Sequence, residues 1–389
     1  MPSFSQSIVG LRIAFLALCF GIVSAPLWTG GAGVDKGQFG SGSRNPHLFP
    51  KIGFQDGSWK TFPAAFDAYF GDHFSLRTAY MKLYAFTLWH LFHVSSSSEV
   101  LVGRAGWLYY NDVEDNDPIA TYRGTNLLVD ARWQAARSAL VAWRDWLQAR
   151  GIGFVVCIAP EKTSIYPEYL PPGFATRNHR TRVDQFMEAC AGPGDIEVVD
   201  LRGPVLQAKQ DGKLPLYFRT DTHWNPAGAH VGASVLLKAL SSRLPAIEPL
   251  DDSDFAPQVE AAPGGDLAKI LGIETGLKDW TVAYRPRLPL EEAPLDPDQG
   301  VVVTGESRST LPRALFFRDS FANGMIPFLS PDFSRAVYIW DHQLDPRLIE
   351  KEKPDIVVLE MVERYVSHTV DLLPPEEMLR QYPKSFYLP

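Results

Sequence analysis

The chain has 389 residues, of which 46% are hydrophobic and 12% aromatic, enough for one large domain or two smaller ones with a sizeable core. Its 37 Lys and Arg residues against 45 Asp and Glu residues give a formal net charge of −8. This mildly acidic balance, without a long run of one sign, argues against a nucleic-acid partner, which would require a clustered basic face.

The first feature along the chain is an uncharged segment at residues 13–34, directly preceded by Arg12. Its length lies between the apolar core of a signal peptide and a membrane span. The small residues "VSA" at 23–25 resemble a cleavage site, but Pro26 follows at once and disfavours cleavage. We therefore predict an uncleaved signal-anchor over residues 1–35, with a cleaved signal peptide and a buried core helix as alternatives. If the segment is an anchor or a cleaved signal peptide, the rest of the chain is exported.

Residues 36–99 are predicted to form a linker and a helical lead-in. The stretch 33–53 is rich in Gly, Ser and Pro, and apolar residues at helical spacing follow it. Asp72 and His73 lie in that helical stretch. Adjacent residues on a helix point about 100° apart, so we predict a structural role for this pair and not a catalytic one.

From residue 100 onward, buried strands alternate with helices. A hairpin at 99–110 is followed by predicted helices at 131–151, 181–192, 226–244 and from Phe321, and by predicted strands at 152–160, 196–201, 313–318, 334–340 and 354–362. This alternation indicates a mostly parallel sheet covered on both faces. We predict a three-layer α/β/α domain over 100–389, with a Pro-rich, irregular insertion at 245–313 over one end of the sheet.

The cysteines and histidines do not form a recognisable metal-binding pattern. Cys157 lies in the buried run "GFVVCIA" and is interpreted as a small apolar core residue, although export would permit a disulfide with Cys190. The nine histidines are scattered and show no ligand spacing. We predict neither a metal nor a cofactor.

The first candidate reactive stretch is "FRTDTHWNPAGAH" at 218–230. Asn225 is a strong helix N-cap and Pro226 a favoured first helical residue, so Asp221 and His223 lie just before the helix. In an extended chain, residues i and i+2 point the same way, so the Asp221 carboxylate can fix the His223 tautomer and leave the far nitrogen free as a base. The alternative is a loop stabilised by Asp turn-bonding, with the imidazole packed on the neighbouring Trp.

The second stretch is "ALFFRDSFANGM", where a buried strand runs into a turn and a short helix. Ser320 stands at that turn, which exposes a hydroxyl beside N–H groups that can stabilise an oxyanion. The alternative is that Ser320 or Asp319 caps the helix. Because ligands gather beyond the carboxyl ends of parallel strands, the two stretches together predict an acyl-transfer triad of Ser320, His223 and Asp221. His230 is a weaker candidate base and fits a packing role better.

These residues and their order resemble a known family. "ALFFRDSF" is similar to the Gly-Asp-Ser block of SGNH hydrolases, with Arg318 where those proteins have Gly. In ordinary members the Ser block precedes an Asp-x-x-His near the C-terminus, whereas here Asp-x-His precedes Ser. That permuted order resembles the alginate O-acetyltransferase family, AlgJ and AlgX. Further similar blocks follow in order over roughly residues 60–365: "DHFSLR", "VLVGRAGWLYY", "APEKTSIYPEYLP", "TDTHWNPAGA", "GGDLAKILG" and "RDSFANGMIPFL". The chain ends soon after "VLEMVERY", which leaves no room for the carbohydrate-binding module of AlgX-type proteins. With its predicted N-terminal anchor, it therefore resembles AlgJ more closely, or the related proteins that acetylate exported cellulose.

The resemblance implies an SGNH hydrolase-like α/β/α fold and an O-acetyltransferase. An acetyl-serine on Ser320 would pass its acetyl group to hydroxyls of an exported polysaccharide, alginate or a related exopolysaccharide. The implied partners are a membrane-bound O-acyltransferase that supplies the acetyl group and other export-complex proteins. The implied location is the periplasm, anchored to the inner membrane, or soluble there if the signal is cleaved. The candidate substrate-binding residues are Lys162, Arg318, Asn323 and Tyr365.

Two other functions are compatible with the same residues. A carbohydrate acetylesterase would use the same triad with water as the acceptor, and the exclusion of water from the site would separate the two enzymes. A non-catalytic polysaccharide-binding component of an export complex would require Ser320, His223 and Asp221 all to be structural. The acidic net charge gives no attraction for an anionic polymer, so a neutral glucan remains an open acceptor.

Overall fold

The computed structural model describes the chain in segments and as two compact units. The described residues are four single positions before residue 47 and the ranges 47–52, 57–73, 77–174, 180–192, 196–248, 250, 257–284, 291–294, 302–305, 310–385 and 387. The smaller unit comprises Met1–Ser96 and Ile270–Ile273, and the larger comprises Ser97–Lys269 and Glu274–Pro389. The predicted signal-anchor lies almost wholly outside the described residues. Within the described part of the chain, no helix is long and apolar enough to span a membrane.

The smaller unit is helical where it is described. Its elements are η1 (Ser58–Lys60), α2 (Phe62–His73), α3 (Arg77–Thr87) and the π-helical turn η2 (Leu88–Phe92). Asp72 and His73 end α2, and their side chains lie outside the described residues. Several large apolar side chains of these helices are exposed, among them Trp59, Phe66 and Leu83.

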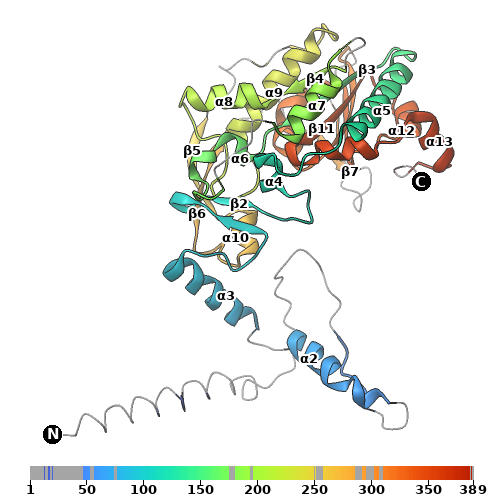
Figure 1. The fold of residues 1–389 in the computed structure, drawn as a ribbon. Coiled ribbons are helices and arrows are strands. Elements are labelled where there is room, and N and C mark those ends of the chain that lie inside the picture. The colour runs from blue at the N-terminus through green and yellow to red at the C-terminus, as the bar shows by residue number, and fades with distance from the viewer. Residues whose placement is uncertain are drawn as a thin grey trace. The chain divides into compact units, whose positions relative to one another are not determined.

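The larger unit is built on a mostly parallel sheet, as predicted. Seven described strands form it in the order β4-β3-β11-β9-β10-β8-β7. Figure 1 labels β4, β3, β11 and β7 of this sheet. The parallel strands are β4 (Val198–Asp200), β3 (Gly153–Ala159), β11 (Ile356–Val362), β9 (Arg313–Arg318) and β10 (Arg335–Trp340). Antiparallel strands β8 (Val302–Gly305) and β7 (Glu291–Pro294) extend the edge beside β10. The carboxyl ends of the parallel strands therefore meet along one edge.

Alternate residues of the central strands are buried on opposite faces of the sheet. In β3, Val155 and Cys157 join one apolar cluster, whereas Val156 and Ile158 join the other. The nearly continuous apolar sequence of this strand is explained by burial on both sides. Cys157 and Cys190 are both buried, are not joined by a disulfide, and belong to different clusters. The interpretation of Cys157 as a core residue is confirmed.

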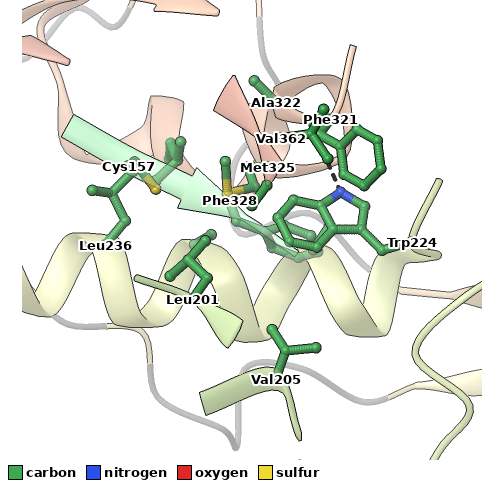
Figure 2. Close-up of a cluster of buried hydrophobic side chains, with 14 of the residues drawn as sticks. Cys157, Leu201, Val205, Trp224, Leu236, Phe321, Ala322, Met325, Phe328 and Val362 are labelled. Carbon is green, nitrogen blue, oxygen red and sulfur yellow. Dashed lines mark hydrogen bonds between the residues drawn. The ribbon is translucent and has the colours of Figure 1, made fainter. Parts of the chain in front are cut away.

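Helices cover both faces and complete three layers. One cluster brings in α8 (Arg202–Gln210), α9 (Pro226–Ser241) and α11 (Ala322–Leu329), and the other brings in α5 (Asp130–Gln148), α7 (Arg182–Cys190) and α12 (Pro346–Glu352). Figure 2 shows the first cluster, with Cys157 and Leu236 on one side and Met325, Phe328 and Trp224 on the other. This packing brings the start of α9 beside the start of α11.

The stretch 245–313 differs from the irregular insertion that the sequence predicts. It contains a two-stranded hairpin, β5 (Gln258–Pro263) and β6 (Lys278–Ala283), with α10 (Asp266–Ile270) between its strands. It also supplies β7 and β8 to the central sheet. Its described apolar runs are short, and runs of that length carry no clear periodicity.

The remaining elements are short. The predicted hairpin at 99–110 is confirmed as antiparallel strands β1 (Val100–Val102) and β2 (Leu108–Tyr110). The others are η3 (Arg104–Gly106), α4 (Pro118–Arg123), α6 (Lys162–Ile165), η4 (Pro167–Tyr169), η6 (Ser330–Asp332), η7 (Glu363–Asp371) and α13 (Pro375–Gln381).

Candidate active site

Ser320 lies in the turn that joins the end of β9 to the start of α11. The neighbouring Asp319 holds this turn. Its carboxylate accepts the backbone N–H of Phe321 at 2.8 Å and that of Val362, the last residue of β11, at 2.7 Å. Asp319 thus ties the turn before α11 to the end of β11, while the Ser320 hydroxyl contacts a histidine.

The segment before α9 is fixed at the helix start, as predicted. The Asn225 side chain accepts the N–H groups of Ala227 at 2.9 Å and Gly228 at 3.2 Å, and Pro226 is the first helical residue. Upstream, a single antiparallel bridge joins Tyr217 to the Trp just before the cap. The residues between these two fixed points form a tight loop that carries Asp221 and His223.

A continuous chain of hydrogen bonds runs from Asp221 to Ser320. Asp221 Oδ1 lies 2.8 Å from His223 Nδ1 and also accepts the His223 backbone N–H at 3.0 Å. His223 Nε2 lies 2.8 Å from Ser320 Oγ. An ionised carboxylate only accepts hydrogen bonds, so Nδ1 carries the imidazole proton and Nε2 is left to accept from the serine hydroxyl. This is the geometry of a general base beside a nucleophile.

The two loops are joined by a second contact beside the triad. Trp224 Nε1 donates to the carbonyl of Phe321 at 2.9 Å (Figure 2). The His223 ring also packs against the Phe321 ring, with centroids 5.0 Å apart. The residues that flank His223 and Ser320 therefore fix the separation of the two functional groups.

The electrostatics of the pair favour an ionised Asp221 and a more basic His223. Burial alone would raise the pKa of Asp221, but the hydrogen bond and charge of His223 outweigh it and lower this pKa below its usual range. Burial alone would lower the pKa of His223, but the hydrogen bond and charge of Asp221 raise it above 6.5. An ionised Asp221 beside His223 would thus stabilise an imidazolium if the ring took the proton of Ser320.

Asp266, which the sequence analysis did not single out, forms the outer support of this pair. Its backbone N–H donates to Asp221 Oδ2 at 2.9 Å, and its carboxylate lies 3.5 Å from His223 Nδ1. Burial, and then the charge of Asp221, raise the pKa of Asp266. The preceding Gly265 permits this approach, because a Cβ there would overlap the Asp221 side chain. The block "GGDLAKILG" contains both residues, and only its similarity to the family drew attention to it.

These three residues also form the one potential metal-binding cluster among the described residues. Ligand atoms of Asp221, His223 and Asp266 lie within 4.8 Å of one another. The hydrogen bonds of Asp221 and His223 already account for this proximity, and both imidazole nitrogens are engaged in them. A metal on either nitrogen would displace one of these bonds.

Lys162, predicted as a groove residue, is 2% exposed and faces the loop of the triad. Its ammonium donates to the carbonyls of Phe218 at 3.2 Å, Arg219 at 3.3 Å and Asp221 at 2.5 Å. Burial lowers the pKa of Lys162 to about 8, against the opposing charges of nearby carboxylates such as Asp266. Lys162 therefore holds the backbone that carries Asp221.

The other predicted substrate-binding residues have different surroundings. Arg318 is 2% exposed and donates to the carbonyl of Asp319 at 3.1 Å. The Tyr365 hydroxyl is partly buried and donates to the Asp115 carboxylate at 2.8 Å. Asn323 is exposed in the first turn of α11. Of the four predicted substrate-binding residues, only Asn323 is exposed to solvent.

His230, the weaker candidate base, is buried in α9. Its ring contacts the Phe328 ring edge-on, with centroids 5.2 Å apart. This supports the packing role that the sequence favoured.

A hydrogen-bonded Ser, His and Asp at the carboxyl edge of a three-layer α/β/α sheet is typical of SGNH hydrolase-like proteins. A family model described as "SGNH hydrolase-like domain, acetyltransferase AlgX" matches residues 100–317, more than half of the 389 residues. The chain belongs to this AlgX family.

Relatives with known names support the same grouping. The chain is 31% identical over 221 residues to a probable alginate O-acetylase AlgJ of Pseudomonas syringae pv. tomato, covering 56% of this chain and 52% of the relative. It is 25% identical over 337 residues to a probable AlgJ of Pseudomonas aeruginosa, covering 79% of this chain and 80% of the relative. The chain thus spans about half the length of the first relative.

Among solved structures, Bacillus cereus PatB1 shares the fold. The TM-score is 0.53 at 15% sequence identity, and the match covers 72% of this chain and 99% of PatB1.

Proposed function

We propose that this protein is a polysaccharide O-acetyltransferase that works through an acetyl-serine on Ser320. The observation that carries the proposal is the chain of hydrogen bonds Asp221–His223–Ser320, in a member of a family whose model describes an acetyltransferase. The 2.8 Å separation of His223 Nε2 and Ser320 Oγ is short enough for the serine proton to pass to the imidazole, and the 2.8 Å bond from Nδ1 to Asp221 holds that ring in place.

In the first half-reaction, Ser320 Oγ attacks the carbonyl carbon of an acetyl ester. His223 Nε2 takes the serine proton, and Asp221 stabilises the resulting imidazolium. The backbone N–H of Ser320 serves as one donor to the oxyanion. The ester C–O bond then breaks, and the departing alcohol takes the proton from His223.

In the second half-reaction, a sugar hydroxyl attacks the acetyl-serine and gives its proton to His223 Nε2. The bond between the acetyl carbon and Ser320 Oγ breaks, and the serine oxygen recovers the proton. The enzyme returns to its initial state, and the acetyl group has moved to the sugar.

The acceptor and the setting are proposed from the relatives' names. Because these are probable alginate O-acetylases, we propose alginate or a related exopolysaccharide as the acceptor. The acetyl group would come from a membrane-bound O-acyltransferase within an export complex. The catalytic domain would be residues 100–389, located in the periplasm and tethered to the inner membrane by residues 1–35 through the lead-in 36–99.

The test uses the full-length protein, an activated acetyl ester and a panel of oligosaccharides, with mass spectrometry to follow the acetyl group. Acetylated sugar from the native protein, absent with Ser320→Ala, is the expected result. Free acetate without acetylated sugar would indicate an esterase. Turnover that survives Ser320→Ala would contradict the proposed nucleophile.

A further inference from the structure

Trp340 is unusual among the residues of the central sheet. The four residues before it in β10 are buried, whereas Trp340, at the carboxyl end of the strand, is 49% exposed. Every other residue of the five parallel strands is buried or partly buried, so Trp340 is the one that presents a large apolar side chain to solvent.

One face of the Trp340 ring is supported from within the protein. The Arg318 guanidinium lies over it, 4.5 Å from the ring centroid. Arg318 is itself 2% exposed and bonded to the carbonyl of Asp319. The indole is thus backed by a fixed cation, and this packing orients a ring that remains half open to solvent.

Trp340 lies close to the nucleophile. It pairs with Arg318 on the neighbouring parallel strand β9, two residues before Ser320. With neighbouring strands about 4.8 Å apart, the backbones of Trp340 and Ser320 are within about 10 Å of each other. The strand order places β10 on one side of β9, and β11 and β3 on the other. The loop of His223 is held by Lys162, which follows β3, so Trp340 flanks Ser320 on the opposite side.

We propose that Trp340 is a sugar-stacking subsite that receives a pyranose ring of the acceptor polysaccharide. The proposal rests on the acetyltransferase function given above and names the part of the site that holds its acceptor. The flat apolar face of an indole fits the C–H face of a pyranose and leaves the sugar hydroxyls at the ring edge, free to react. A ring stacked there would hold a hydroxyl near Ser320 without occupying the side from which His223 acts.

The test measures binding and needs no turnover. Full-length protein with Ser320→Ala is titrated calorimetrically with cellohexaose and with hexamannuronate, alone and combined with Trp340→Ala. We expect at least one sugar to bind, and Trp340→Ala to weaken that binding about five- to tenfold. Trp340→Phe should retain most of the affinity. Trp59→Ala, at a tryptophan of the smaller unit with 48% exposure, is the matched control and should change nothing.

A second readout uses acetyl transfer by protein with an intact Ser320. Trp340→Ala should raise KM for the acceptor about five- to tenfold, with a smaller effect on kcat. Unchanged affinity in Trp340→Ala, or binding of neither sugar, would overturn the subsite. Because the binding assay is done without Ser320, failure of the acetyl-serine mechanism would be seen separately.

Discussion

The surroundings of Ser320 differ between the side towards β11 and β3 and the side towards β10. Towards β11 and β3, polar groups bond to one another: the buried Lys162 to the loop of Asp221, and the partly buried Asp266 to Asp221 itself. Towards β10, the prominent group is an exposed aromatic ring, Trp340, backed by a buried arginine. We infer that proton transfer takes place on the side towards β11 and β3, the closed side, where hydrogen bonds fix the geometry. The acceptor would bind on the side towards β10, where the Trp340 ring is exposed.

The closed side extends beyond the triad. Arg364 Nη1 lies 2.5 Å from Glu161 Oε1, and both side chains are only 5% exposed. Glu363 accepts the Glu161 N–H and the Ser164 hydroxyl, each at 3.0 Å, and burial raises its pKa to about 7. Removing one partner of a buried ion pair costs about 3–5 kcal/mol. Such a network resists movement, which suits a region that positions a base.

The largest effect expected on the closed side comes from His223→Ala. Loss of the base should lower turnover of an activated acetyl ester at least about a thousandfold. The matched control is His230→Ala, which removes a buried histidine that packs on Phe328. That variant should lower the melting temperature yet keep turnover within a few-fold of native. The reverse pattern would move the base to His230.

Asp221→Asn should have the next largest effect and should reduce ester turnover by about a hundred- to ten-thousandfold. The pH dependence of activity tests the direction in which Asp221 shifts the pKa of His223. Asp221 raises the pKa of His223 above 6.5, and catalysis needs the neutral imidazole. Activity of the native protein should therefore be lost as pH falls through a value above 6.5. In Asp221→Asn the residual activity should persist to lower pH. An acid limb at the same pH in both proteins would show that this carboxylate does not control the base.

Lys162→Met should have an intermediate effect. Three carbonyls lose their common donor, and a displacement of about 1 Å at a reacting group can cost about a hundredfold in rate. We expect kcat for the ester to fall about ten- to hundredfold with little change in KM. Lys209→Met is the control, because Lys209 also bonds to a backbone carbonyl, that of Ile165, away from the triad loop. Equal losses in both variants would argue against a specific positioning role.

The smallest effect on ester turnover is expected from Trp224→Phe. Comparison with a second tryptophan variant separates a role in positioning the site from a role in stability. Trp224 and Trp143 are both buried, and each donates to a backbone carbonyl. Trp224 donates to Phe321 at 2.9 Å, and Trp143 donates to Leu373 at 2.8 Å. Leaving a buried carbonyl without its donor costs about 1–3 kcal/mol, so both Phe variants should unfold more readily. Only Trp224→Phe should also lower ester turnover, by a few-fold. Similar activity in the two variants would mean that the Trp224 contact is structural alone.

The sequence predicted the parts of the site that depend on local pattern and strand order. Asp221 and His223 could be paired because they are two residues apart before a capped helix, and Ser320 because it follows a buried strand. The gathering of parallel strand ends then predicted that these residues meet, although Ser320 lies 97 residues from His223.

The sequence did not predict which way the remaining side chains face. Lys162 and Arg318 were expected in a groove, but burial of a cation depends on partners from distant segments, here the loop carbonyls and the Trp340 ring. Asp266 begins a five-residue helix too short to show periodicity. Trp340 ends an apolar strand, and only the structure shows that it is exposed while the residues before it are buried.

The central claim is that Ser320 carries the acetyl group, and trapping that group tests it most directly. Full-length protein would be mixed briefly with an activated acetyl ester, quenched in acid, digested and examined by mass spectrometry. We predict acetyl on the peptide containing Ser320, none there in Ser320→Ala, and loss of the label when an acceptor oligosaccharide is added before the quench. Label on another residue that still passes to the acceptor, or transfer by Ser320→Ala at the native rate, would contradict the account.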